Sequence, residues 1–159
     1  MRLKAAGQGR VQRVLIVDDE PHVRLFLAKV CKLLGIEETA FAEDGEEAIA
    51  QVGAFEPGLV LMDINMPGMD GPEALGQLNA FYRKVPVVFV TSDARPERVR
   101  EAIRHGAMGF LRKDLPTVVL KEKLNELLER AAKEGAYVED FDYAAAAQAA
   151  ADAQREARD

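Results

Sequence analysis

Short apolar runs alternate along this chain with longer segments in which apolar residues recur every three or four positions. A continuous apolar run of roughly four to eight residues is typical of a strand buried on both faces of a parallel sheet. The second run is more polar than the others, which favours an edge position. Five strands are therefore predicted, at residues 14–17, 36–42, 59–62, 85–90 and 107–111.

Helical periodicity occupies the segments between these runs. Pro21 suits the first turn of a helix, where a missing N–H costs nothing, and Gly35 suits its end. In the fourth helical segment, Val99, Ala102 and Ile103 are expected to face the core. Helices are predicted at residues 21–34, 46–52, 72–82, 95–105 and around 120–131.

The alternation of strand and helix, repeated five times, predicts an α/β fold. Such crossover units build a doubly wound, five-stranded parallel sheet with five helices on its two faces. The flavodoxin-like strand order 2-1-3-4-5 is taken from the commonest sheet of this size. Ligands of such sheets bind at the carboxyl ends of the strands, where the winding reverses.

Acidic residues follow two strands that this order makes neighbours. Asp18 and Asp19 come directly after the first strand, and Asp63 comes directly after the third. Three carboxylates that converge in a partly buried site repel one another strongly. Protonation of one of them would relieve the repulsion, and so would a hard divalent cation such as Mg²⁺.

Two further polar residues lie at the ends of the fourth and fifth strands. Thr91 ends the fourth strand and Lys113 ends the fifth. A hydroxyl donor and an ammonium group that face a metal-loaded carboxylate suit a phosphoryl group. Taken alone, Thr91 is a residue that strands favour, Lys113 is a surface lysine paired with Asp114, and each acid is a helix cap. The combination is what favours a site.

The charge is concentrated at the end of the chain. The formal net charge is −6, and residues 134–159 contain seven acidic residues and two arginines, a balance of −5 that leaves −1 for residues 1–133. Neither part has the basic footprint of a nucleic-acid binder, so no DNA partner is expected. No apolar run approaches a membrane span, so no membrane partner is expected either. Cys31 is the one cysteine, which excludes an internal disulfide and favours the cytoplasm.

The chain divides into three predicted segments. Residues 1–10 form a flexible leader, residues 11–134 form the main domain, and residues 135–159 form an acidic, alanine-rich tail with no separate output domain. Alanine has the highest helix propensity, although short isolated helices are marginal. The tail is therefore expected to be helical or disordered. As a helix it would either pack on this domain or contact a partner or a second copy.

Four motifs at the ends of the expected strands carry a family resemblance. Asp18-Asp19, the stretch from Asp63 to Gly71, Thr91-Ser92 and Lys113 together resemble the receiver domain of two-component response regulators. The resemblance extends over residues 11–133. It implies a signalling module that is phosphorylated on an aspartate in a Mg²⁺-dependent reaction.

The resemblance implies a role for each matching residue. Asp63 would accept the phosphoryl group. Asp19 and Asp63 would bind Mg²⁺ directly, Asp18 would act partly through water, and Asn65 would contribute its backbone carbonyl. Thr91 and Lys113 would hold the phosphoryl oxygens. Phe110 would be the aromatic switch residue, which moves together with Thr91.

The resemblance also implies partners. A histidine kinase or a phosphotransfer protein would supply the phosphoryl group, and the chain would otherwise catalyse only its own phosphorylation and dephosphorylation. A downstream protein would bind the face formed by the fourth helix, fifth strand and fifth helix, and a homodimer is left open. The fourth helix gives this face the basic residues Arg95, Arg98, Arg100 and Arg104, and two further basic residues are expected nearby, Arg112 and Lys121.

Two positions depart from the family pattern. Asp114 stands where a proline usually follows the lysine, so it could draw Lys113 away and a cis peptide is not assumed. Asp93 lies two residues after Thr91 and, with Asn65, is expected to tune the phosphoryl lifetime. Two other functions stay open: an adaptor that works without phosphorylation, and a phosphatase with a nucleophilic Asp63. Such phosphatases commonly have an acid where Asn65 stands.

Overall fold

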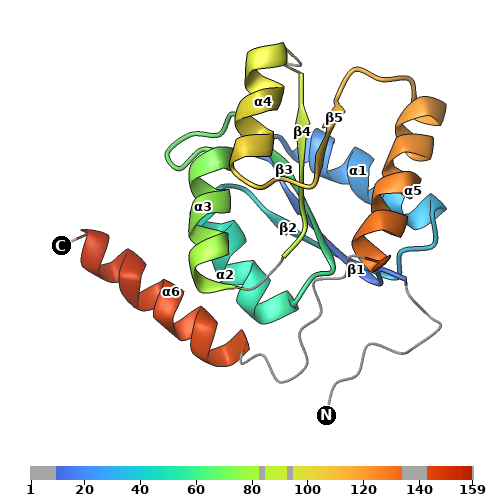
Figure 1. The fold of residues 1–159 in the computed structure, drawn as a ribbon. Coiled ribbons are helices and arrows are strands. Elements are labelled where there is room, and N and C mark those ends of the chain that lie inside the picture. The colour runs from blue at the N-terminus through green and yellow to red at the C-terminus, as the bar shows by residue number, and fades with distance from the viewer. Residues whose placement is uncertain (1–9, 83–84, 93–94, 134–142, 159) are drawn as a thin grey trace.

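The five predicted strands form one parallel sheet in the order β2-β1-β3-β4-β5, which confirms the expected topology (Figure 1). The computed structural model describes residues 10–82, 85–92, 95–133 and 143–158. All five strands start within two residues of their predicted starts, and β2 is an edge strand as expected. Their bounds are β1 Arg13–Val17, β2 Glu38–Ala42, β3 Leu59–Asp63, β4 Val87–Thr91 and β5 Gly109–Arg112.

In the described part of the chain, four helices connect the strands and two more follow the last strand. Pro21 begins α1 as predicted, and Asp44 and Asp70 cap α2 and α3 by accepting the N–H of Glu47 and Glu73. The second helix is longer than predicted. The bounds are α1 Pro21–Leu33, α2 Gly45–Phe55, α3 Gly71–Phe81, α4 Pro96–Arg104, α5 Thr117–Lys133 and α6 Tyr143–Arg158. No helix in the described part of the chain has the length and apolar character to span a membrane.

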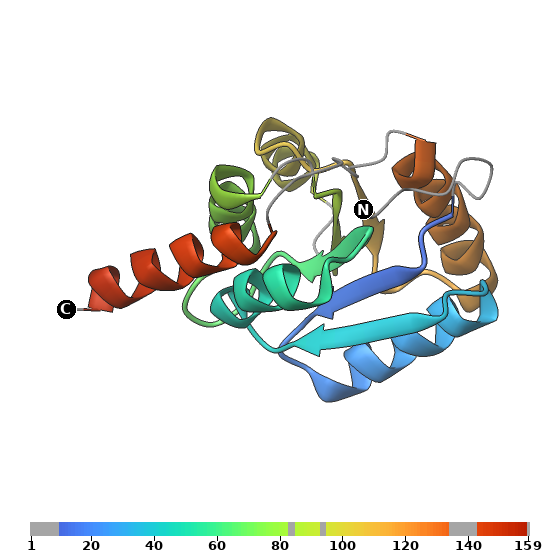
Figure 2. The ribbon, with the colours of Figure 1, turned by 90° about the horizontal axis from the view of Figure 1, so that it is seen from below.

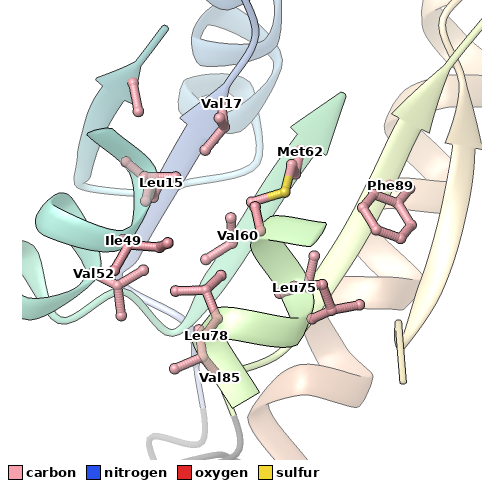
Figure 3. Close-up of a cluster of buried hydrophobic side chains, with 14 of the residues drawn as sticks. Leu15, Val17, Ile49, Val52, Val60, Met62, Leu75, Leu78, Val85 and Phe89 are labelled. Atoms are coloured by element: carbon pink, nitrogen blue, oxygen red, sulfur yellow. The ribbon is translucent and has the colours of Figure 1, made fainter. Parts of the chain in front are cut away.

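The helices form two layers, one on each face of the sheet. Residues of α2, α3 and α4 pack on one face together with every second residue of the inner strands (Figure 3). Residues of α1 and α5 pack on the opposite face with the alternate set. Because both faces are covered, the inner strands are apolar along their length apart from Arg13, the first residue of β1, and the buried polar residues lie at their carboxyl ends.

Helix α4 contacts the sheet less closely than the sequence predicts. Ala102 is buried and Val99 is half-buried, but Ile103 is 61% exposed. The prediction that Ile103 faces the core is therefore wrong. The helix has nine residues and a narrow buried side, and Ile103 lies about 100° around the axis from Ala102. Ile103 instead joins the exposed residues Arg100 and Arg104 on the outer surface.

The C-terminal helix α6 packs on the same domain. It lies along α2 and α3, away from the sheet, and its far end extends beyond them (Figure 2). Ala150 is 2% exposed and belongs to the apolar cluster of the α2–α3 layer. An alanine-rich helix can approach another helix closely because its side chains are small. Of the two arrangements expected of a helical tail, packing on this domain is the one in the structure.

Replacing Ala150 by glutamate should release α6 from the domain. The substitution places an unpaired charge in an apolar contact, and we expect it to lower the free energy of unfolding by about 1 to 2 kcal/mol. The loss is limited because the helix can detach while the sheet stays folded. Ala149→Glu is the matched control, since Ala149 is exposed. Urea denaturation followed by circular dichroism checks this, and equal stability of the two variants would contradict docking in solution.

Candidate functional site

The strand register brings Asp18 and Asp63 to the same edge of the sheet. Val17 pairs with Met62, so the residues that follow them lie level on neighbouring strands. Asp18 is 1% exposed and Asp63 is 5% exposed. The N–H of Asp18 also donates to Ala42 of β2 (3.1 Å), which fixes the turn that leaves β1. Two carboxylates are thereby held next to each other with little access to water.

Lys113 joins these two carboxylates from β5's side of the sheet. Its Nζ lies 2.8 Å from Oδ2 of Asp18 and 3.3 Å from Oδ2 of Asp63, with Glu20 farther away at 3.9 Å. The backbone N–H of Lys113 donates to Thr91 (2.8 Å), which anchors the residue to β4. The predicted meeting of these acids with Lys113 is therefore present in the structure.

Burial and the neighbouring charges shift the pKa values of both Asp63 and Lys113. Burial raises the pKa of Asp63 from 3.8 to about 6, against the lowering effect of the Lys113 charge, and Asp18 raises it further. Burial lowers the pKa of Lys113, but its close contact with the Asp18 carboxylate and the charges of both acids outweigh that effect, so the net shift is upward. At neutral pH the site holds a charged lysine and a largely ionised Asp63.

A cluster of three carboxylates lies where β1 meets α1. Oxygen atoms of Asp18, Asp19 and Glu20 all lie within 4.8 Å of one another, with Asp19 and Glu20 exposed. Glu20 received no role in the sequence interpretation, although it is the third consecutive acid and lies directly before a helix. Its N–H donates to Oδ1 of Asp18 (2.9 Å), which orients that carboxylate.

Arg24 is a second residue that the sequence interpretation missed. Its Nη1 donates to the backbone oxygen of Asp18 (2.6 Å), and its guanidinium lies 5.9 Å from the ring centroid of Phe41. Its Nη2 is 3.9 Å from Glu43. Arg24 thus ties the acidic loop to β2 and to the loop after it. The sequence carried no signal for these contacts, because they join Arg24 to a backbone oxygen and to residues that are distant along the chain.

Thr91 and Phe110 occupy the positions that the strand order predicts. Thr91 is 1% exposed at the end of β4, next to the strand that carries Asp63. Phe110 pairs with Phe89 across β4 and β5 and packs, half-buried, against the α2–α4 layer. The role of Phe110 as a switch stays a prediction.

Asn65 lies beside the acceptor candidate on the loop that follows β3. Its backbone N–H donates to Oδ1 of Asp63 at 3.4 Å, and its exposed side chain accepts a hydrogen bond from Arg98 of α4 (3.0 Å). The hydrogen bond from Arg98 therefore connects the basic helix α4 to the site. The second residue expected to tune the phosphoryl lifetime, Asp93, lies outside the described residues.

Asp114 does not pair with Lys113. It forms a two-point contact with Arg112 instead, at 2.9 Å to Nε and 2.6 Å to Nη2. Hydrogen bonds from Arg112 lower the pKa of Asp114. The neighbouring arginine thus leaves Lys113 on its carboxylates, and the interpretation of Lys113 as a surface lysine paired with Asp114 is wrong. No cis peptide bond occurs among the described residues.

Comparison with known proteins agrees with this geometry. Residues 14–125 match the response regulator receiver domain family, and the chain belongs to that family. It is 37% identical over 121 residues to the regulatory protein AtoC of Escherichia coli, a match that covers 76% of this chain but only 25% of AtoC. It is 34% identical to the chemotaxis protein CheY of Pseudomonas aeruginosa, with 74% of this chain and 97% of CheY covered.

Solved structures show the same fold. The CheY-like response regulator receiver domain protein of Methanospirillum hungatei superposes with a TM-score of 0.69 at 28% identity, and the match covers 79% of this chain and 99% of that one. The chain is therefore a CheY-like receiver domain of two-component signalling, a class of signalling protein.

Proposed function

We propose that this domain accepts a phosphoryl group on Asp63 and signals through a change of its surface. The observation that carries the proposal is the contact of Lys113 with both Asp63 and Asp18 at the carboxyl edge of the sheet. Burying two neighbouring carboxylates costs free energy, and groups of this kind are concentrated at functional sites. A receiver domain supplies such a reaction, and the raised pKa of Asp63 still leaves a nucleophilic carboxylate at neutral pH.

The transfer exchanges one bond to phosphorus for another. An oxygen of Asp63 attacks the phosphorus of the donor, the bond from phosphorus to the donor's leaving atom breaks, and an aspartyl phosphate forms. Lys113 then faces a dianionic phosphoryl group, and its raised pKa keeps it cationic for that role. Thr91, at the end of the neighbouring strand, is proposed to donate a hydrogen bond to the same oxygens.

The donor atoms of this site fit Mg²⁺. Oδ2 of Asp18 is buried and accepts no aligned hydrogen bond, since its 2.8 Å contact with Lys113 is an ion pair without hydrogen-bond geometry. Hard oxygen donors of this kind are the ligands that Mg²⁺ prefers. Asp19, Asp63 and the backbone carbonyl of Asn65 would hold the ion, with Asp18 acting partly through water. The bound ion would offset negative charge on the transferring group.

The proposed signal passes from Thr91 to the outer surface. Thr91 moves toward the new oxygens, Phe110 turns into the space beside it, and the face of α4, β5 and α5 is repacked. The exposed residues Ile103, Arg100 and Arg104 lie on that face. An apolar residue between two cations suits a protein partner of acidic character.

The proposed partners are a phosphoryl donor protein and a protein target. A histidine kinase or a phosphotransfer protein would load Asp63, and the output would be a contact with another protein and not with DNA or a membrane. Residues 11–134 would form the receiver unit, with 135–159 as its tail. The proposed setting is the cytoplasm, where the buried free thiol of Cys31 stays reduced.

Asp63→Asn should abolish phosphorylation because an amide is not a nucleophile toward phosphorus. We expect wild type incubated with acetyl phosphate and Mg²⁺ to gain the mass of one phosphoryl group, and Asp63→Asn to gain none. Removing Mg²⁺ with EDTA should abolish the gain in wild type. Asp44→Asn is the matched control, since Asp44 caps α2 outside the site and asparagine is an equally good cap.

Intact-protein mass spectrometry distinguishes this proposal from its alternative. A folded wild-type protein that gains no mass with an active donor would contradict the proposal and favour an adaptor that works without phosphorylation. A gain of mass that persists in Asp63→Asn would move the acceptor to another residue.

A further inference from the structure

Arg98 connects α4 to the loop that carries the acceptor candidate. Its Nη2 donates to the side-chain oxygen of Asn65 at 3.0 Å, and its Nη1 lies 2.9 Å from Oε2 of Glu101, one turn further along α4. The Arg98 side chain is 24% exposed, so most of it is covered. One guanidinium therefore bridges a helix residue and a loop residue in a fixed geometry.

This bridge lies one hydrogen bond away from Asp63. The backbone N–H of Asn65 donates to Oδ1 of Asp63 (3.4 Å), while the side chain of the same residue is held by Arg98. A guanidinium has only donors, so the atom of Asn65 that faces Arg98 is the carbonyl oxygen. The side-chain oxygen of Asn65, two residues after Asp63, is thus held by Arg98 of α4.

We propose that Arg98 is a positioning residue that prolongs the lifetime of the phosphoryl group by engaging the side-chain oxygen of Asn65. The inference rests on the proposed function, since it concerns the same acceptor. It assigns to α4 a direct effect on the stability of the signal, in addition to its place on the output face.

The physical reason lies in the hydrolysis step. A water oxygen attacks phosphorus, the bond from phosphorus to the Asp63 oxygen breaks, and inorganic phosphate and the free carboxylate are formed. The attacking water must lose a proton, and an acceptor that orients it speeds the step. The side-chain oxygen of Asn65 is such an acceptor when it is free. Donation from Arg98 occupies that oxygen and holds the side chain toward α4.

Glu101 supports the same arrangement. Its carboxylate is half-buried and holds Nη1 of Arg98, which leaves Nη2 directed at Asn65. Lysine at position 98 could donate to Asn65 or to Glu101, but it lacks the fork that reaches both. Arg98→Lys is therefore expected to restore part of the effect that Arg98→Ala removes.

The test is a comparison of phosphoryl lifetimes. Each protein is loaded with acetyl phosphate and Mg²⁺, the donor is removed, and the phosphorylated fraction is followed by intact mass. We expect Arg98→Ala to shorten the lifetime about fivefold, the effect of one hydrogen bond, with Arg98→Lys in between. Arg155→Ala, an exposed arginine on α6, should retain the wild-type lifetime.

A double-mutant cycle shows whether Arg98 acts through Asn65. In the Asn65→Ala background, Arg98→Ala should no longer change the lifetime, because the oxygen that Arg98 holds is gone. An unchanged or longer lifetime in Arg98→Ala would overturn the inference, and so would an equal shortening in both backgrounds. Thermal denaturation confirms that each variant is folded, and Arg98→Lys replaces the alanine variant if that one is not.

The loading step distinguishes this inference from the proposed function. A wild-type protein that takes no phosphoryl group overturns both. Normal loading of all variants, with identical lifetimes, overturns only the role of Arg98 and leaves Asp63 as the acceptor.

Discussion

Replacing Asp63 by asparagine should stabilise the metal-free domain at neutral pH by about 2 kcal/mol, although it removes the proposed acceptor. The carboxyl group of Asp63 is 5% exposed, and its burial raises its pKa from 3.8 to about 6. An ionised group in such a place costs free energy that a neutral amide of nearly the same shape does not. The prediction concerns protein in EDTA, where no cation offsets the charge.

The direction of the pH dependence follows from the two pKa values. Unfolded chains release the proton of Asp63 near pH 3.8, and the folded domain releases it near pH 6. Between these values the folded state binds more protons, so the free energy of unfolding falls as pH rises through this window. Above it the loss is constant, and about two pKa units correspond to about 3 kcal/mol. This shift already includes the attraction to Lys113. The amide group brings N–H donors of its own into a buried place, and an unsatisfied donor costs about 1 kcal/mol, which reduces the expected gain to about 2 kcal/mol.

Urea denaturation at several pH values checks this result. Asp63→Asn should be more stable than wild type at about pH 7.5 and close to it below about pH 3, where Asp63 is protonated in both states. Asp44→Asn, which changes a partly exposed helix cap outside the site, should stay close to wild type at both pH values. Mg²⁺ should stabilise wild type more than Asp63→Asn at neutral pH. Equal stabilities in EDTA at neutral pH would show that burial of the ionised Asp63 carboxylate does not destabilise the domain.

Much of the fold followed from the sequence because each strand carries its own signal. The runs that end at Asp63 and Thr91 are apolar without interruption, which only a strand covered on both faces requires. Once such strands are placed in parallel, their carboxyl ends meet at one edge, so the proximity of Asp18 to Asp63 follows from topology. The strand order was an assumption, and the structure confirms it.

The contacts that lie beyond one strand end could not be predicted in the same way. The bond from Arg98 to Asn65 joins a helix and a loop 33 residues apart, and nothing in the spacing of either segment indicates it. The pairing of Asp114 with Arg112 depends on the directions in which these two side chains point at the end of β5. Side-chain pairing of this kind is decided by tertiary placement, whereas apolar periodicity records only burial.

The sequence predicted the C-terminal tail as either helical or disordered, and it did not predict where a helix would pack. Its alanine-rich sequence has high helix propensity but little apolar pattern, so the sequence does not say which face, if any, is covered. The burial of Ala150 depends on apolar side chains that α2 and α3 place on the outside of their layer. A helix with weak patterning is placed by its partner surface and not by its own sequence.

Gly71 should be the least replaceable glycine of the described acceptor loop. It begins α3, and its N–H donates to the backbone oxygen of Ile64 at 2.8 Å. A Cβ at this position would lie 2.6 Å from the backbone oxygen of Asp63, 2.8 Å from Cε1 of Phe89 and 3.0 Å from Cα of Ile64. Two of these three atoms belong to the main chain of the segment that carries the acceptor, so they cannot rotate away.

Gly71→Ala should therefore lower the free energy of unfolding by about 2 to 3 kcal/mol and slow phosphorylation. The added methyl group has to push α3 away from β3 or displace the backbone of Asp63, and either movement disturbs the acceptor carboxylate. Gly76→Ala in the same helix is the matched control, since its Cβ would meet nothing within 4 Å. That variant should gain up to about 1 kcal/mol because alanine is the better helix former.

Urea denaturation and the rate of mass gain with acetyl phosphate measure the two effects separately. A Gly71→Ala protein as stable as wild type would show that the loop can move without cost. A destabilised protein that is still phosphorylated at the wild-type rate would show that α3 moves and Asp63 does not. Because the two glycines lie five residues apart in one helix, opposite signs in their stability changes would locate the constraint at the contact with β3 and not in the helix itself.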